Sequence, residues 1–271
     1  MLTSQRNSRR GFTAVELVLV IVVLAIVVGV TMWQVDKRRQ AQLREESYQN
    51  LRQLYRGYPG TPKGVGWENS GVFRTGMSGA WPALSSIPGQ LSLPPSDGIL
   101  LHGDPPGISV ASLIISPAHP QAYRMRKDAL ANHESAFTDD SYWYLGYVLR
   151  NEEAGLAFVE AYRKSIQKTG KPPAGKIKIE SRIESNGDDY TLNLLSIFSR
   201  RPSIGHGYTV MQPIIRTPTP VLIERPGLQR GGSNVVWSNG KVEFIPYPGK
   251  FPMTEKFVKA LESLDKLKVK P

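Results

Sequence analysis

An almost unbroken apolar run occupies residues 12–35, and a single carboxylate, Glu16, interrupts it near its start. The run has about the twenty residues that a helix needs to cross a bilayer. A charged side chain inside a membrane segment costs free energy, so a glutamate kept there needs a partner or a function. The pattern therefore predicts a membrane-spanning helix in which Glu16 has a specific role.

The helical pattern continues beyond the apolar run, over residues 36–58. Apolar and aromatic residues recur there at spacings of three and four, through Tyr48, Leu51, Leu54 or Tyr55, and Tyr58. Pro59 and Gly60 then end the helix. We expect one long helix over residues 12–58, whose second half packs on a globular head and contributes its tyrosines to the core.

Two further helices are predicted in the head. Residues 152–167 follow a capping residue, Asn151, and their apolar face is Leu156, Val159, Tyr162 or Arg163, and Ile166. A final helix starts at Thr254, with Phe257, Leu261 and Leu264 at spacings of four and three.

The strands of the head are predicted from β-prone segments between Pro-rich breaks. These segments are residues 141–149, 177–183, 190–198, 209–215 and 220–224. Residues 57–120 are rich in Gly, Pro and Ser, which favours an irregular insertion or a series of short strands. Near the end, residues 233–237 and 241–245 form a predicted hairpin, in which Asn239 and Gly240 make a type I′ turn. The expected fold class is α+β, a long helix packed on a small antiparallel sheet.

Composition gives little support for nucleic-acid binding or for redox chemistry. The net charge of +11 is spread over the arginines of residues 6–10, over residues 37–39 and over the C-terminal lysines, and no nucleic-acid reader motif accompanies it. The chain has no cysteine. We therefore expect no nucleic-acid partner, and redox chemistry does not identify the compartment.

Enzymatic and metal sites are not indicated either. The four histidines, at positions 102, 119, 133 and 206, stand apart and lack metal-ligand spacing. The pairs Asp139–Asp140 and Asp188–Asp189 offer oxygens for Ca²⁺, but we favour solvated turns for both pairs. The prediction is a protein without catalytic residues, metal site or cofactor.

The start of the apolar run carries a family resemblance. Gly11 and Phe12 follow a leader that contains arginines and no acid, and Glu16 comes four residues after Phe12. This pattern resembles the class III signal of type IV pilins and of type II secretion pseudopilins. The resemblance implies that residues 1–11 are a cytoplasmic leader, that prepilin peptidase cuts between Gly11 and Phe12, and that Phe12 is then N-methylated. It also implies that Glu16 is needed for assembly and that residues 59–271 form an extracytoplasmic head.

The spacing of Phe12 and Glu16 has a physical meaning of its own. The two residues lie about one helical turn apart, so cleavage would create an amine near the carboxylate at the start of a helix. When helices pack with an axial offset, the amine of one subunit can pair with the carboxylate of its neighbour. Such pairs would set the register of a filament.

The C-terminal hairpin carries a second, partial resemblance. It looks like the tail of pseudopilin-like bacterial proteins, in which a His, nine residues and Asp-Gly precede His-Val-Glu-Phe. Here the corresponding positions hold Gln229, Asn239, Gly240 and Lys241, so both histidines and the aspartate are absent. We therefore expect no metal or catalytic role for these positions in this chain.

Together these features predict a pseudopilin, a minor or specialised structural subunit of a type II secretion or type IV pilus-like fibre. The implied partners are prepilin peptidase, other pilin or pseudopilin subunits, the inner-membrane assembly platform and the lipid bilayer. The implied location is the inner membrane, crossed once, with the head in the periplasm. The alternative is a membrane-tethered extracytoplasmic binding module that does not polymerise.

Overall fold

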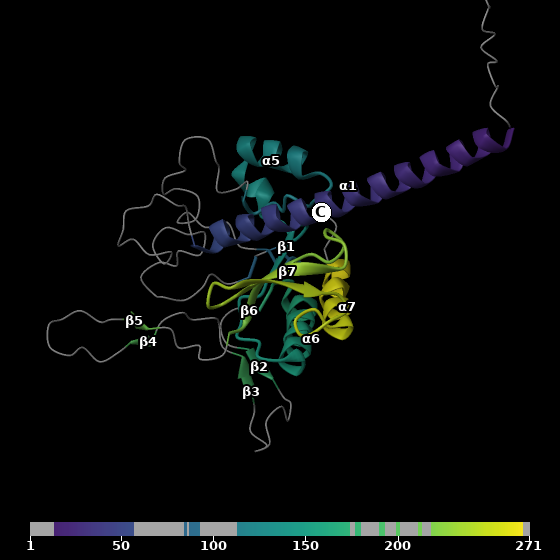
Figure 1. Cartoon of the computed structure of the whole chain (residues 1–271). Helices are drawn as coiled ribbons and strands as arrows, with labels where there is room; N and C mark the ends of the chain where they lie inside the picture. The colour runs from purple at the N-terminus through teal and green to yellow at the C-terminus, as the bar shows by residue number, and fades with distance from the viewer. Residues whose placement is uncertain are drawn as a thin grey trace, which may run out of the picture. The chain divides into compact units, whose positions relative to one another are not determined.

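The computed structural model describes residues 14–56, 84–85, 87–92, 113–173, 177–179, 190–192, 199–200, 211–212 and 218–267. The chain divides into two compact units, residues 1–42 and residues 43–271. Helix α1, Ala14–Arg56, contains residues 14–35 of the apolar run and continues into the second unit (Figure 1). The predicted continuation of the helix beyond the apolar run is therefore confirmed as far as Arg56. Tyr58, the expected end, lies outside the described residues.

The second unit is built around a four-stranded antiparallel sheet. Its strands follow the order β1 (Tyr142–Tyr144), β6 (Pro220–Glu224), β7 (Gly232–Trp237) and β8 (Val242–Pro246). All residues of β1 and β6 are buried, which means that both faces of these strands are covered. The sheet and the long helix together give the expected α+β layout. The segment predicted over 141–149 forms regular strand only over Tyr142–Tyr144.

The β7–β8 hairpin is confirmed, but its predicted turn type is wrong. Gly240 has φ of 79°, whereas no non-glycine residue among those described has positive φ, so Asn239 cannot occupy a type I′ turn. The Gly240 amide donates to the Trp237 carbonyl, and the Trp237 amide donates to the Lys241 carbonyl. The connection is therefore a three-residue loop that ends in a left-handed glycine, the next most common hairpin form. The Asn239 side chain accepts from the Lys241 amide at 3.0 Å and stabilises this loop.

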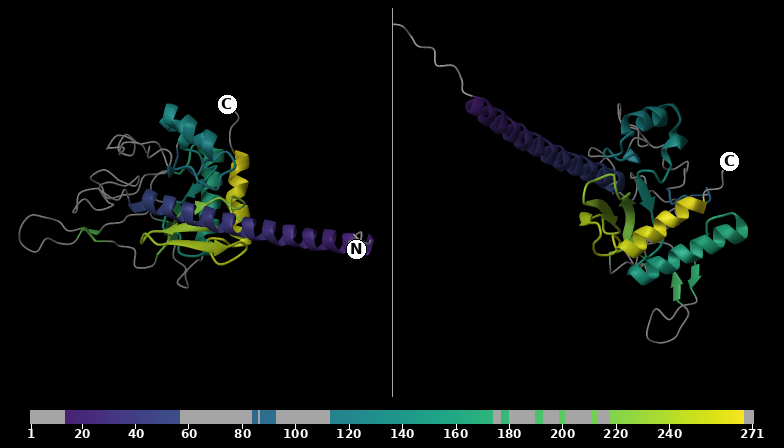
Figure 2. Two further views of the ribbon diagram at one scale, coloured as in Figure 1. Left: turned by 45° about the horizontal axis from the view of Figure 1, so that its top comes forward. Right: turned by 90° about the vertical axis from the view of Figure 1, so that its right-hand side faces the viewer.

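Two helices lie side by side against the sheet in the second unit, α6 (Glu152–Thr169) and α7 (Glu255–Leu264) (Figure 2). Both were predicted. The Asn151 side chain accepts from the Ala154 amide as an N-cap, and Gly170 ends α6 in the left-handed region. The buried face of α6 differs from the expectation in one respect. Phe158 is fully buried, whereas the predicted core residue Leu156 is only half-buried.

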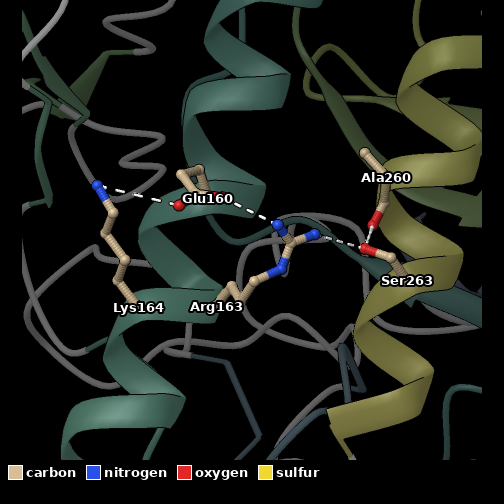
Figure 3. A network of polar contacts seen from close by, with 5 residues as sticks. All are labelled: Glu160, Arg163, Lys164, Ala260 and Ser263. Atoms are coloured by element: carbon tan, nitrogen blue, oxygen red, sulfur yellow. Dashed lines mark hydrogen bonds and ion pairs between the residues drawn. The ribbon is translucent and has the colours of Figure 1, made fainter.

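A short polar network links the outer surfaces of α6 and α7 (Figure 3). The Arg163 guanidinium donates to the Glu160 carboxylate at 3.0 Å and to the Ser263 hydroxyl at 2.7 Å. The Ser263 hydroxyl in turn donates to the Ala260 carbonyl. Because Arg163 reaches across to Ser263 of α7, it connects the two helices through a polar contact, whereas Tyr162, the other residue predicted for this position of the apolar face, is buried in the core.

The remaining described elements are short. Helix α5 (Ala122–Ala131) and the 3-10 turn η1 (His133–Ala136) precede β1, and the 3-10 turn η2 (Asp265–Leu267) follows α7. Two separate strand pairs are β2 (Ile177–Ile179) with β3 (Tyr190–Leu192), and β4 (Ser199–Arg200) with β5 (Met211–Gln212). The predicted strands 177–183, 190–198 and 209–215 therefore contain shorter strands, and their other residues lie mostly outside the described part. Most of the segment 57–120 also lies outside it.

Candidate functional site

The apolar part of α1 exposes nearly every large side chain that it carries. From Val15 to Val35 these side chains are roughly half or more exposed, for example Leu19 at 63% and Trp33 at 63%. Among the residues that the structure describes, α1 is the helix long and apolar enough to span a membrane. Because so much contiguous apolar surface is unfavourable in water, this part of the helix needs lipid or other helices around it.

Glu16 lies in the first turn of α1, at the start of this exposed apolar surface. A carboxylate at a helix N-terminus is favoured by the helix dipole. Gly11 and Phe12 lie outside the described residues. Cleavage between them, methylation of Phe12 and pairing of its amine with Glu16 therefore stay predictions.

In the head, a cluster of polar residues surrounds the buried carboxylate of Glu224, at the end of β6. Glu224 is fully buried. One carboxylate oxygen accepts from the hydroxyls of Ser47 at 2.7 Å and Ser116 at 2.6 Å. The other accepts from the Gln229 side-chain amide at 2.5 Å and from the Asn234 backbone amide at 3.3 Å. Four donors from four segments thus meet on one side chain, and Ser47 is supplied by α1.

The chemistry of this cluster is that of a structural carboxylate. Burial raises the pKa of Glu224, while hydrogen bonds from Ser116 and Ser47 and from the Asn234 amide and Gln229 act in the opposite direction and favour the ionised form. No substrate can reach the carboxylate, since its side chain is enclosed by protein. The arrangement can therefore hold segments together, and it offers no accessible acid or base.

Two further contacts attach the same stretch of α1 to the head. The Asn50 side chain donates to the Leu113 carbonyl at 2.6 Å and to the Tyr142 hydroxyl at 3.1 Å. The Arg44 guanidinium lies 4.2 Å from the centre of the Phe244 ring and donates to the Arg230 carbonyl at 2.7 Å. These polar contacts lie beside Leu51 and Leu54, which are fully buried. Tyr48, one of the tyrosines expected in the core, is only partly buried.

Sequence reasoning did not identify the Glu224 cluster. Ser47 and Asn50 interrupt the apolar face of α1 and look like surface residues, although both are buried. Glu224 is the last residue of the predicted strand 220–224, and its sequence neighbours do not indicate that its carboxylate is buried. The signal that could have found it is the run of polar residues on the buried strand β7, where Ser233 and Asn234 are also enclosed.

The positions compared with the tail motif do not form one site. Gln229 precedes β7 and donates to Glu224, whereas Asn239 and Lys241 lie beyond the other end of the same strand. A six-residue strand spans about 20 Å, so these side chains cannot bind one ion.

The other candidate metal ligands also stay apart. In the described ranges there is no group of three or more His, Cys, Asp or Glu side chains that could hold a metal. The solvated turn expected at Asp139–Asp140 is wrong for Asp139, which is fully buried, while Asp140 is exposed. The backbone carbonyl of Asp139 accepts a hydrogen bond from the Arg225 guanidinium at 3.2 Å. The side chains of His102, His133, His206 and Asp188–Asp189 lie outside the described part.

Comparisons of the chain with protein-family models, with curated proteins and with solved structures found no match.

Proposed function

We propose that this chain is a pseudopilin, a minor or specialised structural subunit of a type II secretion or type IV pilus-like fibre. In this proposal prepilin peptidase removes residues 1–11, Phe12 becomes the methylated N-terminus, and Glu16 pairs with the Phe12 amine of a neighbouring subunit. The observation that supports it best is α1 itself. One helix, Ala14–Arg56, carries an acid in its first turn, an exposed apolar run, and then residues buried in the head.

This layout suits a subunit that moves from a membrane into a fibre. An apolar helix surface is stable in lipid, and it is equally stable against the apolar surfaces of identical helices. The head also needs to be held rigidly on the helix, because the axial register of the helices fixes the positions of the heads in a fibre only when each head is rigidly attached. The contacts of Arg44, Ser47 and Asn50 with the sheet side of the head supply such a connection.

The decisive experiment replaces Glu16 by Leu in the cell that makes the fibre. The change removes a charge from an apolar helix, so membrane insertion, leader cleavage and head folding should be unaffected. Assembly should fail, because each neighbouring amine would lose its partner when the helices pack together. We expect the variant to stay in the membrane fraction and to be absent from sheared fibres.

A matched control is Glu45→Gln, which removes a carboxylate from an exposed position of the same helix within the head unit. This variant should enter fibres like the parent chain. Crosslinking between subunits that is unchanged in Glu16→Leu would contradict the pairing mechanism. Absence of multimers in the parent chain would instead support the alternative, a tethered binding module that does not polymerise.

A further inference from the structure

A group of aromatic and basic side chains marks the C-terminal end of the apolar run. It consists of Trp33, Lys37, Arg38 and Arg39, which are all exposed, and we call it the basic collar. The Lys37 ammonium lies 5.3 Å from the centre of the Trp33 ring, one helical turn away. With Asp36 included, the net charge of this turn is +2.

The collar lies at a defined distance from Glu16 along one continuous helix. Lys37 follows Glu16 by 21 positions, which corresponds to about 32 Å at the α-helical rise. The hydrocarbon core of a bilayer is about 30 Å thick. When Glu16 lies at one face of the core, the collar therefore lies at headgroup level on the opposite face.

The residue types of the collar fit that position. Indole rings favour the interface between hydrocarbon and water, and basic side chains just outside a span bind anionic headgroups. Successive residues of a helix are rotated by about 100°, so Lys37, Arg38 and Arg39 point in three directions around the helix. Neighbouring headgroups on several sides of a single helix can thus be contacted at once.

We propose that the basic collar is a binding site for anionic phospholipid headgroups, recognised through their phosphodiester charge. The site holds the unassembled subunit in the leaflet opposite the leader, and the charges of the collar select the lipid. The inference needs a helix that spans the bilayer, as the proposed function does, but it needs no polymerisation and no cleavage.

Native mass spectrometry of the full chain in a neutral detergent tests this proposal. The delipidated protein is titrated with phosphatidylglycerol and, separately, with phosphatidylcholine. We expect phosphatidylglycerol to bind tighter, and we expect the variant Lys37→Gln/Arg38→Gln/Arg39→Gln to lose about tenfold or more of that affinity, since each basic residue near an anionic surface contributes to binding. Raising the salt concentration should reduce the preference in the parent chain.

A matched control removes three positive charges from exposed positions of the head, Lys127, Lys168 and Lys256, each replaced by Gln. This control should bind phosphatidylglycerol like the parent chain. An equal loss in the control would show a general charge effect and overturn the site, as would an unchanged lipid preference in the collar variant. A collar variant that loses lipid but still enters fibres would support the inference independently of the assembly mechanism. Loss of fibre assembly in Glu16→Leu, with normal assembly of the collar variant, would test the proposed function and leave the lipid site to the titrations.

Discussion

The Ser47 hydroxyl of α1 donates a 2.7 Å hydrogen bond to the Glu224 carboxylate, across a sequence separation of 177 residues. Both side chains are fully buried. Hydrogen bonds to charged groups are stronger than neutral ones, and a buried carboxylate that loses a donor retains the cost of its desolvation. The hydrogen bond between Ser47 and Glu224 therefore contributes to the stability of the folded head.

Replacing Ser47 by Ala should destabilise the head by about 1.5–3 kcal/mol, because one donor to a buried carboxylate is removed. The gain in helix propensity offsets only about 0.5 kcal/mol of this loss. Chemical denaturation of the full chain in detergent, followed by near-ultraviolet circular dichroism, measures the change. Gln49→Ala is the control, since Gln49 is exposed and pairs within α1 with Glu45. Equal stability of the two variants would show that the Ser47 contact contributes little.

Head stability should depend on pH through Glu224. Burial raises the pKa of this group above its ordinary value of 4.5, so the folded head binds its proton more tightly than the unfolded chain does. The contribution of Glu224 is thus complete below about pH 4.5 and is lost as the pH rises through the raised pKa. Relative to Glu224→Gln, the parent chain should become less stable as the pH rises from about 4.5 through the raised pKa of Glu224. If the parent chain instead became more stable than Glu224→Gln with rising pH, the hydrogen bonds from the four donors would lower the pKa of Glu224 by more than burial raises it.

Gly240 should tolerate side chains poorly, because its φ of 79° is unfavourable for other residues. Gly240→Val should destabilise the head by about 1–3 kcal/mol through backbone strain. Asn239→Ala removes only the exposed hydrogen bond to the Lys241 amide, so it should cost less. Thermal melts of both variants give the comparison, and a Gly240→Val melt that matches the parent would refute the strained loop.

Gly232 should be intolerant for a different reason, the close approach of a neighbouring strand. A Cβ at this position would clash with the Ile245 carbonyl oxygen, which belongs to the backbone of β8. Gly232→Ala should therefore force the hairpin apart and cost about 1–3 kcal/mol. Gly227→Ala is the variant for comparison. Open space surrounds Gly227, so an alanine there is unfavourable only because of the φ of 91°. A smaller loss for Gly232→Ala than for Gly227→Ala would exclude the steric explanation.

Leader processing is tested by the mass of the mature chain. A Gly11→Val variant should keep residues 1–11, because the peptidase implied by the pilin resemblance requires a small residue at the cut. Gly11→Ala should be processed better than Gly11→Val. Intact-mass measurement distinguishes these outcomes, and a parent chain that still begins at Met1 would remove the pilin assignment.

The local features of this fold could be predicted because short-range rules decide them. Asn151 caps α6 through a neighbouring amide, and Phe257 and Leu261 of α7 are buried as their spacing predicts. The turn at Asn239 was predicted wrongly because Asn-Gly fits more than one hairpin loop. Which loop forms depends on the strand register, here Val236 opposite Val242.

The Glu224 cluster could not be predicted because its partners come from distant parts of the chain. Ser47, Ser116 and Gln229 are ordinary polar residues in their local sequence, and only the tertiary fold brings them to one carboxylate. In contrast, Glu16 is conspicuous in sequence because a single acid within an apolar run conflicts with its surroundings. Sequence patterns thus detect a polar residue among apolar neighbours more easily than a buried polar network.

The order of the sheet also governs when the head can fold during synthesis. Leu51 and Leu54 emerge early, but the core that buries them includes β6–β8 and the α7 residues up to Leu264. Contacts between distant segments form only after a large loop closes, which makes them slow and late. An incomplete chain therefore exposes this apolar surface until β6–β8 and α7 have been made. Completion of β6–β8 and α7, rather than formation of α1, is then the step that first removes this surface from water.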